Sequence, residues 1–217
     1  MSSIEHQNNT RHAILMTAMH LFAKEGIDVV SLRRISAESG SSNTAAVHYH
    51  FKDKTGLLLA VIAFLKQHIW EPGHQGLVDV VNAGGDIRKV IEAGMRPLKR
   101  PVLDFSWGGD AQAVMFRITT GTNEGAKVAL SDAQDGHMTT FQSALRGLLP
   151  DLPDTVFMQR WHFMITEAMA GQWARARLIR TQMEIDTDWT PQMEREYLYQ
   201  YMDYVVGGLT APVTPLD

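Results

Sequence analysis

The sequence predicts an all-α fold in which a small N-terminal helical domain precedes a larger helical C-terminal domain. Apolar residues recur every three or four positions along most of the 217-residue chain, the spacing that places them on one face of a helix. No segment shows the alternation of apolar and polar residues that is typical of a half-buried strand. Pro72, Gly73 and Gly76 interrupt the helical periodicity and predict a domain boundary near residue 70.

Composition and charge exclude several classes of protein. The chain has no Cys, so disulfides, thiolate metal sites and cysteine nucleophiles are excluded. The longest apolar run, 57–65, has nine residues, well short of the roughly 20 that a membrane-spanning helix needs. Because the polar start is not a secretory signal either, we expect a cytoplasmic protein without a membrane partner. The formal net charge is −4, but residues 1–70 carry +2 and the rest −6, which hints that the first seventy residues meet a polyanion.

The first helix is expected to begin at Arg11, with Thr10 as its N-cap, and to end at Gly26. Its apolar residues fall on one side, which is typical of a helix that covers a core. This stripe consists of Ile14, Leu15, Ala18, Leu21 and Phe22.

Two short helices should follow. One covers 31–39, where Ser31 can cap its start and Gly40 ends it, and the next covers 43–50. Four apolar residues in and just after these helices have the spacing to point toward the small core: Leu32, Ile35, Val47 and Phe51.

Longer helices are expected beyond them. The fourth begins at Asp53 or Thr55 and runs to about Trp70. Asp110 and Thr190 are expected N-caps of two later helices. The helices expected after the domain boundary cover 86–96, 110–121, 132–149, 154–180 and 191–208.

The second and third helices and the tight turn between them have the layout of a helix-turn-helix, which places one helix in the DNA major groove. Helix pairs joined by a glycine turn are also common in all-helical proteins, so the layout alone leaves both readings open. The expected outer face of the third helix favours DNA. Thr44, Ala45 and His48 are small or able to hydrogen-bond base edges, and Tyr49 and His50 lie toward the end, where they can reach phosphates.

Four segments, in this order and at these spacings, resemble the N-terminal domain of the TetR family of transcriptional regulators. They are ILMTAMHLFAKEG, SLRRISAESG, TAAVHYHF and KDKTGLLLAV, all within residues 11–65. The resemblance implies a homodimer with a DNA-binding domain at 1–54, a linking helix at 55–70, and a ligand-binding and dimerisation body at 71–217. It also implies repression of transcription at a palindromic operator that a small-molecule effector relieves.

Matching positions give the residues expected at the DNA. Arg33 corresponds to a position that reads guanine in some members, and a solvent-exposed helix arginine is the equally weighted alternative. The full set is Ser31, Arg33, Asn43, Thr44, Ala45, His48, Tyr49, His50 and Lys54.

The chain departs from the family pattern in two ways. Between Gly40 and Phe51 it has one residue more than the commonest spacing, so Asn43 can take the place of Thr44 at the bases. His48 stands where a tyrosine is frequent, so operator sequences of relatives do not transfer. The N-terminal arm offers only Arg11 and His12 to DNA, so few minor-groove contacts are expected.

The expected helix 154–180 is apolar nearly all round, so it must be covered on more than one side. With helix 191–208 it resembles the two C-terminal helices through which family members dimerise. The alternative is that both simply fill the core of one chain. The residues expected at the dimer interface are Trp161, Ile165, Ala168, Gly171, Ala174, Tyr197, Tyr201 and Tyr204.

The effector is expected to be apolar or aromatic. Nine of the twelve Met and four of the five Trp lie beyond residue 70, and Met lines adaptable apolar cavities. Ordinary core packing is the alternative for each candidate. The candidates are Phe105, Trp107, Phe116, Arg117, His137, His162, Met164 and Trp173.

Two other classes of function compete with this interpretation. Glu71 and His74 have the spacing found in carboxylate-bridged metal bundles, but Pro72 and Gly73 are expected to prevent a helix there. The sequence also has no phosphate-binding Gly-Lys-Ser loop and no Gly-x-Ser-x-Gly elbow, so we expect neither an enzyme nor a bound metal or cofactor. A helical protein-interaction scaffold without sequence-specific DNA binding remains the main alternative.

Overall fold

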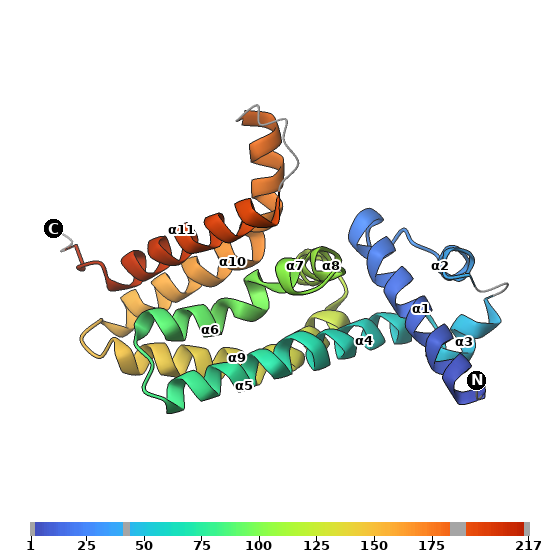
Figure 1. Ribbon diagram of the computed structural model, residues 1–217, viewed down its shortest axis with the longest axis horizontal. Coiled ribbons are helices and arrows are strands. Elements are labelled where there is room, and N and C mark those ends of the chain that lie inside the picture. The colour runs from blue at the N-terminus through green and yellow to red at the C-terminus, as the bar shows by residue number, and fades with distance from the viewer. Residues whose placement is uncertain (1–2, 41–43, 183–189, 215–217) are drawn as a thin grey trace. The chain divides into compact units, whose positions relative to one another are not determined.

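The computed structural model describes residues 3–40, 44–182 and 190–214, and their side chains at 8–40, 44–169 and 190–214. These residues form helices and no strand, so the all-α prediction is confirmed (Figure 1). The chain divides into two compact units. We call Met1–Trp70 with Asp104–Gln134 the head unit, and Glu71–Leu103 with Asp135–Asp217 the body unit. In the described part of the chain, no helix has both the length and the apolar character that crossing a membrane requires.

The head unit is built around α1 (Ser3–Glu25), which packs against α2, α3, α4 and α8. The predicted apolar stripe of α1 is buried at all five positions. The other helices of this unit are α2 (Leu32–Glu38), α3 (Ala45–Phe51), α4 (Lys54–Leu65), the π-helical segment η1 (Lys66–Trp70) and α8 (Gly108–Thr120).

The predicted start of α1 at Arg11 is wrong, because the helix already begins at Ser3. Residues 3–10 contain neither Pro nor Gly, so nothing in the backbone ends the helix before Thr10. Thr10 therefore lies inside the helix and does not cap it.

The predicted break at Pro72 is also wrong. The helix α5 (Glu71–Asn82) follows η1 directly, and Pro72 lies in its first turn, where the missing N–H of proline costs least. Gly73 serves close packing, since a Cβ there would lie 2.4 Å from Cγ of Pro97. Glu71 and His74 thus lie one turn apart on a helix after all, although no cluster of three metal-ligating side chains occurs among the described residues.

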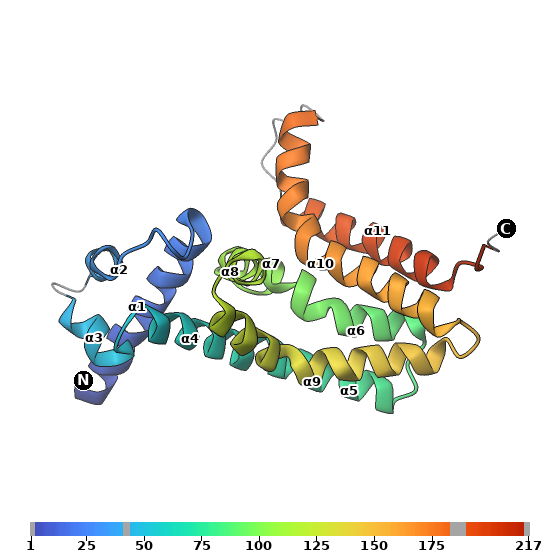
Figure 2. The ribbon, with the colours of Figure 1, turned by 180° about the vertical axis from the view of Figure 1, so that it is seen from behind.

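The body unit consists of long helices around a buried aromatic core. α10 (Asp154–Gln182) and α11 (Pro191–Thr210) run side by side, and α6 (Ile87–Lys99) packs against both (Figure 2). The rings of Phe141 and Trp161 meet at 5.1 Å between centroids and are both buried. Asp86 caps α6, and Thr190 caps α11 as predicted.

Two further helix starts differ from the prediction, and one short helix is additional. α9 (Glu124–Leu148) starts eight residues before the expected 132, because the side chain of Asn123 accepts a hydrogen bond from the N–H of Ala126 and caps it. α8 starts at Gly108, so Asp110 lies in its first turn and is not its N-cap. The short α7 (Pro101–Asp104) was not predicted.

Candidate functional site

The second and third helices are held by the residues that the sequence predicted to point inward. Ser31 caps α2, since its hydroxyl accepts a hydrogen bond from the N–H of Arg34 at 3.3 Å. Ile35 and Val47 are completely buried, and Phe51 is 5% exposed. Because the inner face of α3 is fixed by Val47 and Phe51, the opposite face must point to solvent.

The outer face of α3 carries the residues expected at base edges. Ala45 and His48 are exposed, and Tyr49 is 73% exposed. Thr44 is half-buried at the N-cap position and makes no capping hydrogen bond with its side chain. Asn43 lies outside the described residues, so its predicted contact stays a prediction.

The hydrogen bond of His48 fixes which ring nitrogen carries the proton. Its Nδ1 lies 2.8 Å from the carbonyl oxygen of Lys52. A carbonyl can only accept, so Nδ1 must donate, and Nε2 of the neutral ring is left as an acceptor. An exposed acceptor suits the amino groups of adenine or cytosine in the major groove.

The two arginines of α2 differ in their surroundings. Arg34 pairs with Glu38 at 2.8 Å and with Glu25, and the hydrogen bond to Glu38 together with these charges raises its pKa. Its charge is thus compensated within the protein. Arg33 is exposed and makes no ion pair within the described residues, so of the two it is the one suited to DNA.

Basic and aromatic groups gather at the end of α3. The ring of Tyr49 meets that of His50 edge-on at 5.0 Å, and burial, followed by the nearby charge of Arg11, lowers the pKa of His50. The guanidinium of Arg11 lies 5.2 Å from the ring centre of Phe51. Both causes favour the neutral form of the His50 ring, whereas Arg11 carries a positive charge at this end of α3.

Lys52 and Lys54 follow α3 and have different surroundings. Lys54 donates a hydrogen bond to the carbonyl of Asp28 at 2.8 Å, so it joins the loop before α2 to the start of α4. Its predicted contact with DNA is not tested by this bond. Lys52 is exposed and adopts a positive φ of 69°, which turns the chain between α3 and α4. Sequence reasoning did not select it, although a lysine directly after a recognition helix is a signal for phosphate contact.

Arg117, predicted to contact a ligand, instead fastens α8 to the end of α1. Its Nε donates to the carbonyl of Ala23 at 3.0 Å and its Nη2 to that of Lys24 at 3.4 Å. A cation at a helix C-terminus stabilises the free carbonyls and the helix dipole. His20 and Asp110 form a second link between the same helices, at 3.0 Å.

Other predicted ligand residues pack against their neighbours. Phe105 stacks on Trp107 at 4.3 Å, and Trp107 meets Phe64 edge-on at 5.1 Å. His137 is buried, with Nε2 2.7 Å from the carbonyl of Gly94, and burial lowers its pKa. Phe105 and Trp107 thus pack against neighbouring rings, and His137 bonds to the backbone. Such packing within the chain is the alternative that the sequence left open for these candidates.

The remaining four candidates differ in their exposure. Phe116 is half-buried, His162 is exposed, and Met164 is buried with its carbonyl accepting from the hydroxyl of Tyr201 at 3.4 Å. The side chain of Trp173 lies outside the described ones.

A pocket of about 490 Å³ lies in the body unit, between α5, α6 and α11. None of the eight residues predicted to bind the ligand lines it, and their contact with a ligand stays a prediction. Among those whose side chains are described, only His137 and Met164 are buried. The pocket lining is instead rich in basic side chains.

The predicted dimer residues fall into three groups. Trp161, Ala168 and Tyr201 are buried within the single chain, and their place at a dimer interface stays a prediction. Ile165 and Tyr197 are half-buried, and Tyr204 is 72% exposed. Gly171 and Ala174 lie beyond residue 169, the last residue of α10 whose surroundings are described.

Comparison with known proteins agrees with this geometry. Residues 14–61 match the family model described as bacterial regulatory proteins, tetR family. No curated protein sequence matches the chain. The match to the family model covers α1 from its buried stripe onward, α2, α3 and most of α4.

Three solved structures share the fold. A Rhodococcus sp. protein assigned to the TetR-family transcriptional regulators has a TM-score of 0.61 and 17% identity, over 90% of this chain and 98% of its own. The TetR-family regulator PfmR from Thermus thermophilus has a TM-score of 0.57 and 17% identity, over 93% and 96%. NalD, the secondary repressor of the MexAB-OprM multidrug efflux pump in Pseudomonas aeruginosa, has a TM-score of 0.56 and 16% identity, over 92% and 97%.

Proposed function

The chain has a TetR-family N-terminal domain and the fold of TetR-family transcriptional regulators, and from this premise we propose that it is a ligand-responsive repressor. It binds a palindromic operator as a homodimer, and an effector bound in the body releases it. In this proposal residues 1–54 bind DNA, 55–70 link the two parts, and 71–217 bind the effector and the partner chain.

The single observation that carries the proposal is the two-sided character of α3. Val47 and Phe51 anchor it in the core, while Ala45, His48 and Tyr49 face solvent. An exposed face with small residues at its start allows a helix to approach base edges closely. A helix of a protein-interaction scaffold has no need for this combination of small, imidazole and phenol groups.

The residues of the head divide into base-reading and phosphate-binding groups. His48 reads an amino group through Nε2, and Thr44 and Ala45 sit next to it at the start of α3. Tyr49 and the cations Arg11 and Lys52 bind phosphates, which positions the helix without reading sequence.

The homodimer uses the exposed aromatic residues of α10 and α11. Phe163 and Tyr204 are both 72% exposed, which is unusual for large apolar side chains. A two-fold dimer presents two α3 helices, which can enter successive major grooves when they are about 34 Å apart.

In the dimer, release from DNA requires a ligand that binds more tightly to a second form. In that form the distance between the two α3 helices no longer fits successive major grooves. In the head unit α8 is suited to transmit such a change, because Arg117 and Asp110 fix it to α1. A ligand shifts the equilibrium only by its difference in affinity for the two forms. A difference of about 3 kcal/mol would weaken operator binding roughly a hundredfold.

Fluorescence anisotropy with a duplex from directly upstream of the gene tests the proposal. The full-length protein should bind it at least about tenfold more tightly than a scrambled duplex, and raising salt from about 50 to 200 mM should weaken binding by about a hundredfold or more. Light scattering should give twice the chain mass. Equal binding to both duplexes by a folded protein would favour the scaffold alternative and contradict the proposal.

A further inference from the structure

The pocket in the body unit has a charge opposite to that of its surroundings. Five basic residues line it against one acidic residue, Glu92. Residues 71–217 as a whole contain 13 basic and 19 acidic residues, so the lining gathers five of the 13 and only one of the 19. The basic residues are Lys89, Arg96, Lys99, Arg100 and Arg195.

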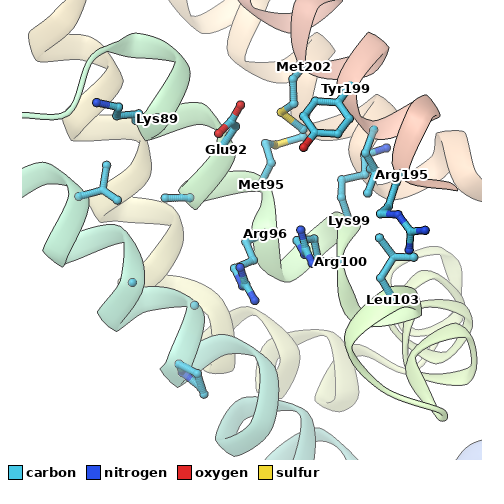
Figure 3. Close-up of a pocket in the computed structure, with 16 residues that line it drawn as sticks. Lys89, Glu92, Met95, Arg96, Lys99, Arg100, Leu103, Arg195, Tyr199 and Met202 are labelled. Carbon is cyan, nitrogen blue, oxygen red and sulfur yellow. The ribbon is translucent and has the colours of Figure 1, made fainter. Parts of the chain in front are cut away.

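Three arginines and a group of apolar side chains occupy neighbouring parts of the pocket. Arg96 on α6, Arg100 at the C-cap of that helix and Arg195 on α11 lie below or to the right of Met95 in Figure 3. Met95, Met202 and Tyr199 lie together above the arginines, with Glu92 beside them and Lys89 farther out (Figure 3). The arginine side of the pocket is therefore cationic, whereas the other side combines apolar groups with one charge of each sign.

Lys99 forms the buried base of the cationic side. It is 1% exposed, its Nζ lies 3.3 Å from Oε2 of Glu167, and the ammonium is 4.1 Å from the ring centre of Tyr201. One carboxylate and one aromatic face thus hold Lys99 in place. Arg195, in contrast, is exposed and makes no ion pair within the described residues.

We infer that this pocket binds an amphipathic organic anion, with its acidic group among Arg96, Arg100 and Arg195 and its apolar body against Met95, Met202 and Tyr199. A guanidinium fork matches a carboxylate or sulfonate in two hydrogen bonds, and methionine adapts to apolar groups of different shape. A volume of about 490 Å³ suits a ligand of this kind. The apolar or aromatic effector expected from the sequence thereby gains an acidic group.

That such an anion is the effector rests on the proposed function, whereas its binding to the pocket does not. The two parts are therefore measured separately, the first on the protein alone and the second with DNA.

Two fluorescent probes with the same rings test binding. Anilinonaphthalenesulfonate is an organic anion, and N-phenylnaphthylamine is its neutral counterpart without the sulfonate. The folded protein should bind the anion at one site per chain, and at least about tenfold more tightly than the neutral probe. Equal affinity for the two probes would overturn the inference.

Variants then locate the site. Arg195→Gln removes an exposed charge and should leave the fold intact, and it should weaken binding of the anion by about fivefold or more while leaving the neutral probe unaffected. Lys127→Gln removes one positive charge from α9, outside the pocket lining, and serves as the control. If both variants behaved as the wild type, or if both weakened binding equally, the anion would bind elsewhere and the inference would be wrong.

The effector role is tested with the operator duplex. Saturating anilinonaphthalenesulfonate should lower DNA affinity of the wild type more than that of Arg195→Gln. Unchanged DNA affinity in the wild type would remove the effector role. Failure of the protein to bind DNA in the absence of any probe would overturn the proposed function instead, and would leave the binding result standing.

Discussion

Replacing Gly94 with Ala would place a methyl group against the ring of Phe141. A Cβ at this position would lie 2.2 Å from Cδ2, 2.3 Å from Cε2 and 2.4 Å from Cγ of that ring. The ring cannot easily move away, because Phe141 is fully buried and packs edge-on against Trp161. The carbonyl of Gly94 also accepts the hydrogen bond from His137 at 2.7 Å, so α6 is held from two sides.

The expected cost follows from two opposing terms. Forcing a methyl group into a packed core costs about 1–3 kcal/mol. Replacing glycine by alanine inside a helix returns about 0.5–1 kcal/mol. Gly94→Ala should therefore lower the free energy of unfolding by about 1–2 kcal/mol.

Gly136→Ala is the matched control. Gly136 lies within α9, and no heavy atom lies within 4 Å of a Cβ built there. The same chemical change should raise stability by about 0.5–1 kcal/mol, because only the helix term acts. The difference between the two variants thus isolates the contact with Phe141.

Urea unfolding followed by circular dichroism gives both values, at one fixed protein concentration because the protein is expected to dimerise. In a Phe141→Leu background, Gly94→Ala should cost less than in the wild type, since the clashing ring is gone. If Gly94→Ala were as stable as Gly136→Ala, the close approach of α6 and α9 would be refuted.

Three more predictions concern single side chains. Arg117→Ala should lower the free energy of unfolding by about 1–2 kcal/mol, because it removes the donor for the last carbonyls of α1, and unchanged urea unfolding would argue against this cap. Burial lowers the pKa of His137 in the folded protein, so the unfolded chain takes up a proton first as pH falls through the ordinary value of 6.5. The contribution of neutral His137 to the free energy of unfolding should therefore be complete above this pH and decrease below it. His137→Gln should flatten that dependence between pH 7 and 5, and an unaltered slope would contradict the assignment. His48→Ala should reduce discrimination at one base pair by about 1–3 kcal/mol, measured with substituted operators, whereas Tyr49→Phe should weaken binding to all duplexes alike; the opposite pattern would exchange their roles.

Local rules predicted much of the head unit. The spacing of Val47 and Phe51 predicts the inner face of α3, and Ser31 is predicted as the cap of α2 because a hydroxyl before an apolar helix has few other roles. The same rule predicts Thr190 as the cap of α11 in the body unit. These features depend on residues close in sequence, so no knowledge of the tertiary structure was needed.

Features that depend on distant contacts could not be predicted in this way. From sequence alone Gly73 is expected to break a helix, and only the structure shows that Pro97 packs against it. Likewise Arg117 is expected to contact a ligand, and only the structure shows that it bonds to the end of α1. The cationic pocket joins residues of α5 and α6, which follow each other in sequence, to residues of α11 far along the chain. Aromatic content suggested a ligand site, but the rings of Phe105 and Trp107 stack on each other at half-buried positions in the head unit and do not line the pocket.

A negative charge placed on the outer face of α3 tests most directly whether this face enters the DNA groove. Ala45 is exposed at the first position of α3, where Glu favours the helix dipole but faces the phosphates of a bound duplex. Val128→Glu adds the same charge on α9, at a side chain that is 58% exposed. Operator affinity measured by anisotropy should fall by about a hundredfold or more for Ala45→Glu and stay within about threefold of the wild type for Val128→Glu, with both proteins as stable as the wild type. Tight operator binding by folded Ala45→Glu would contradict the account.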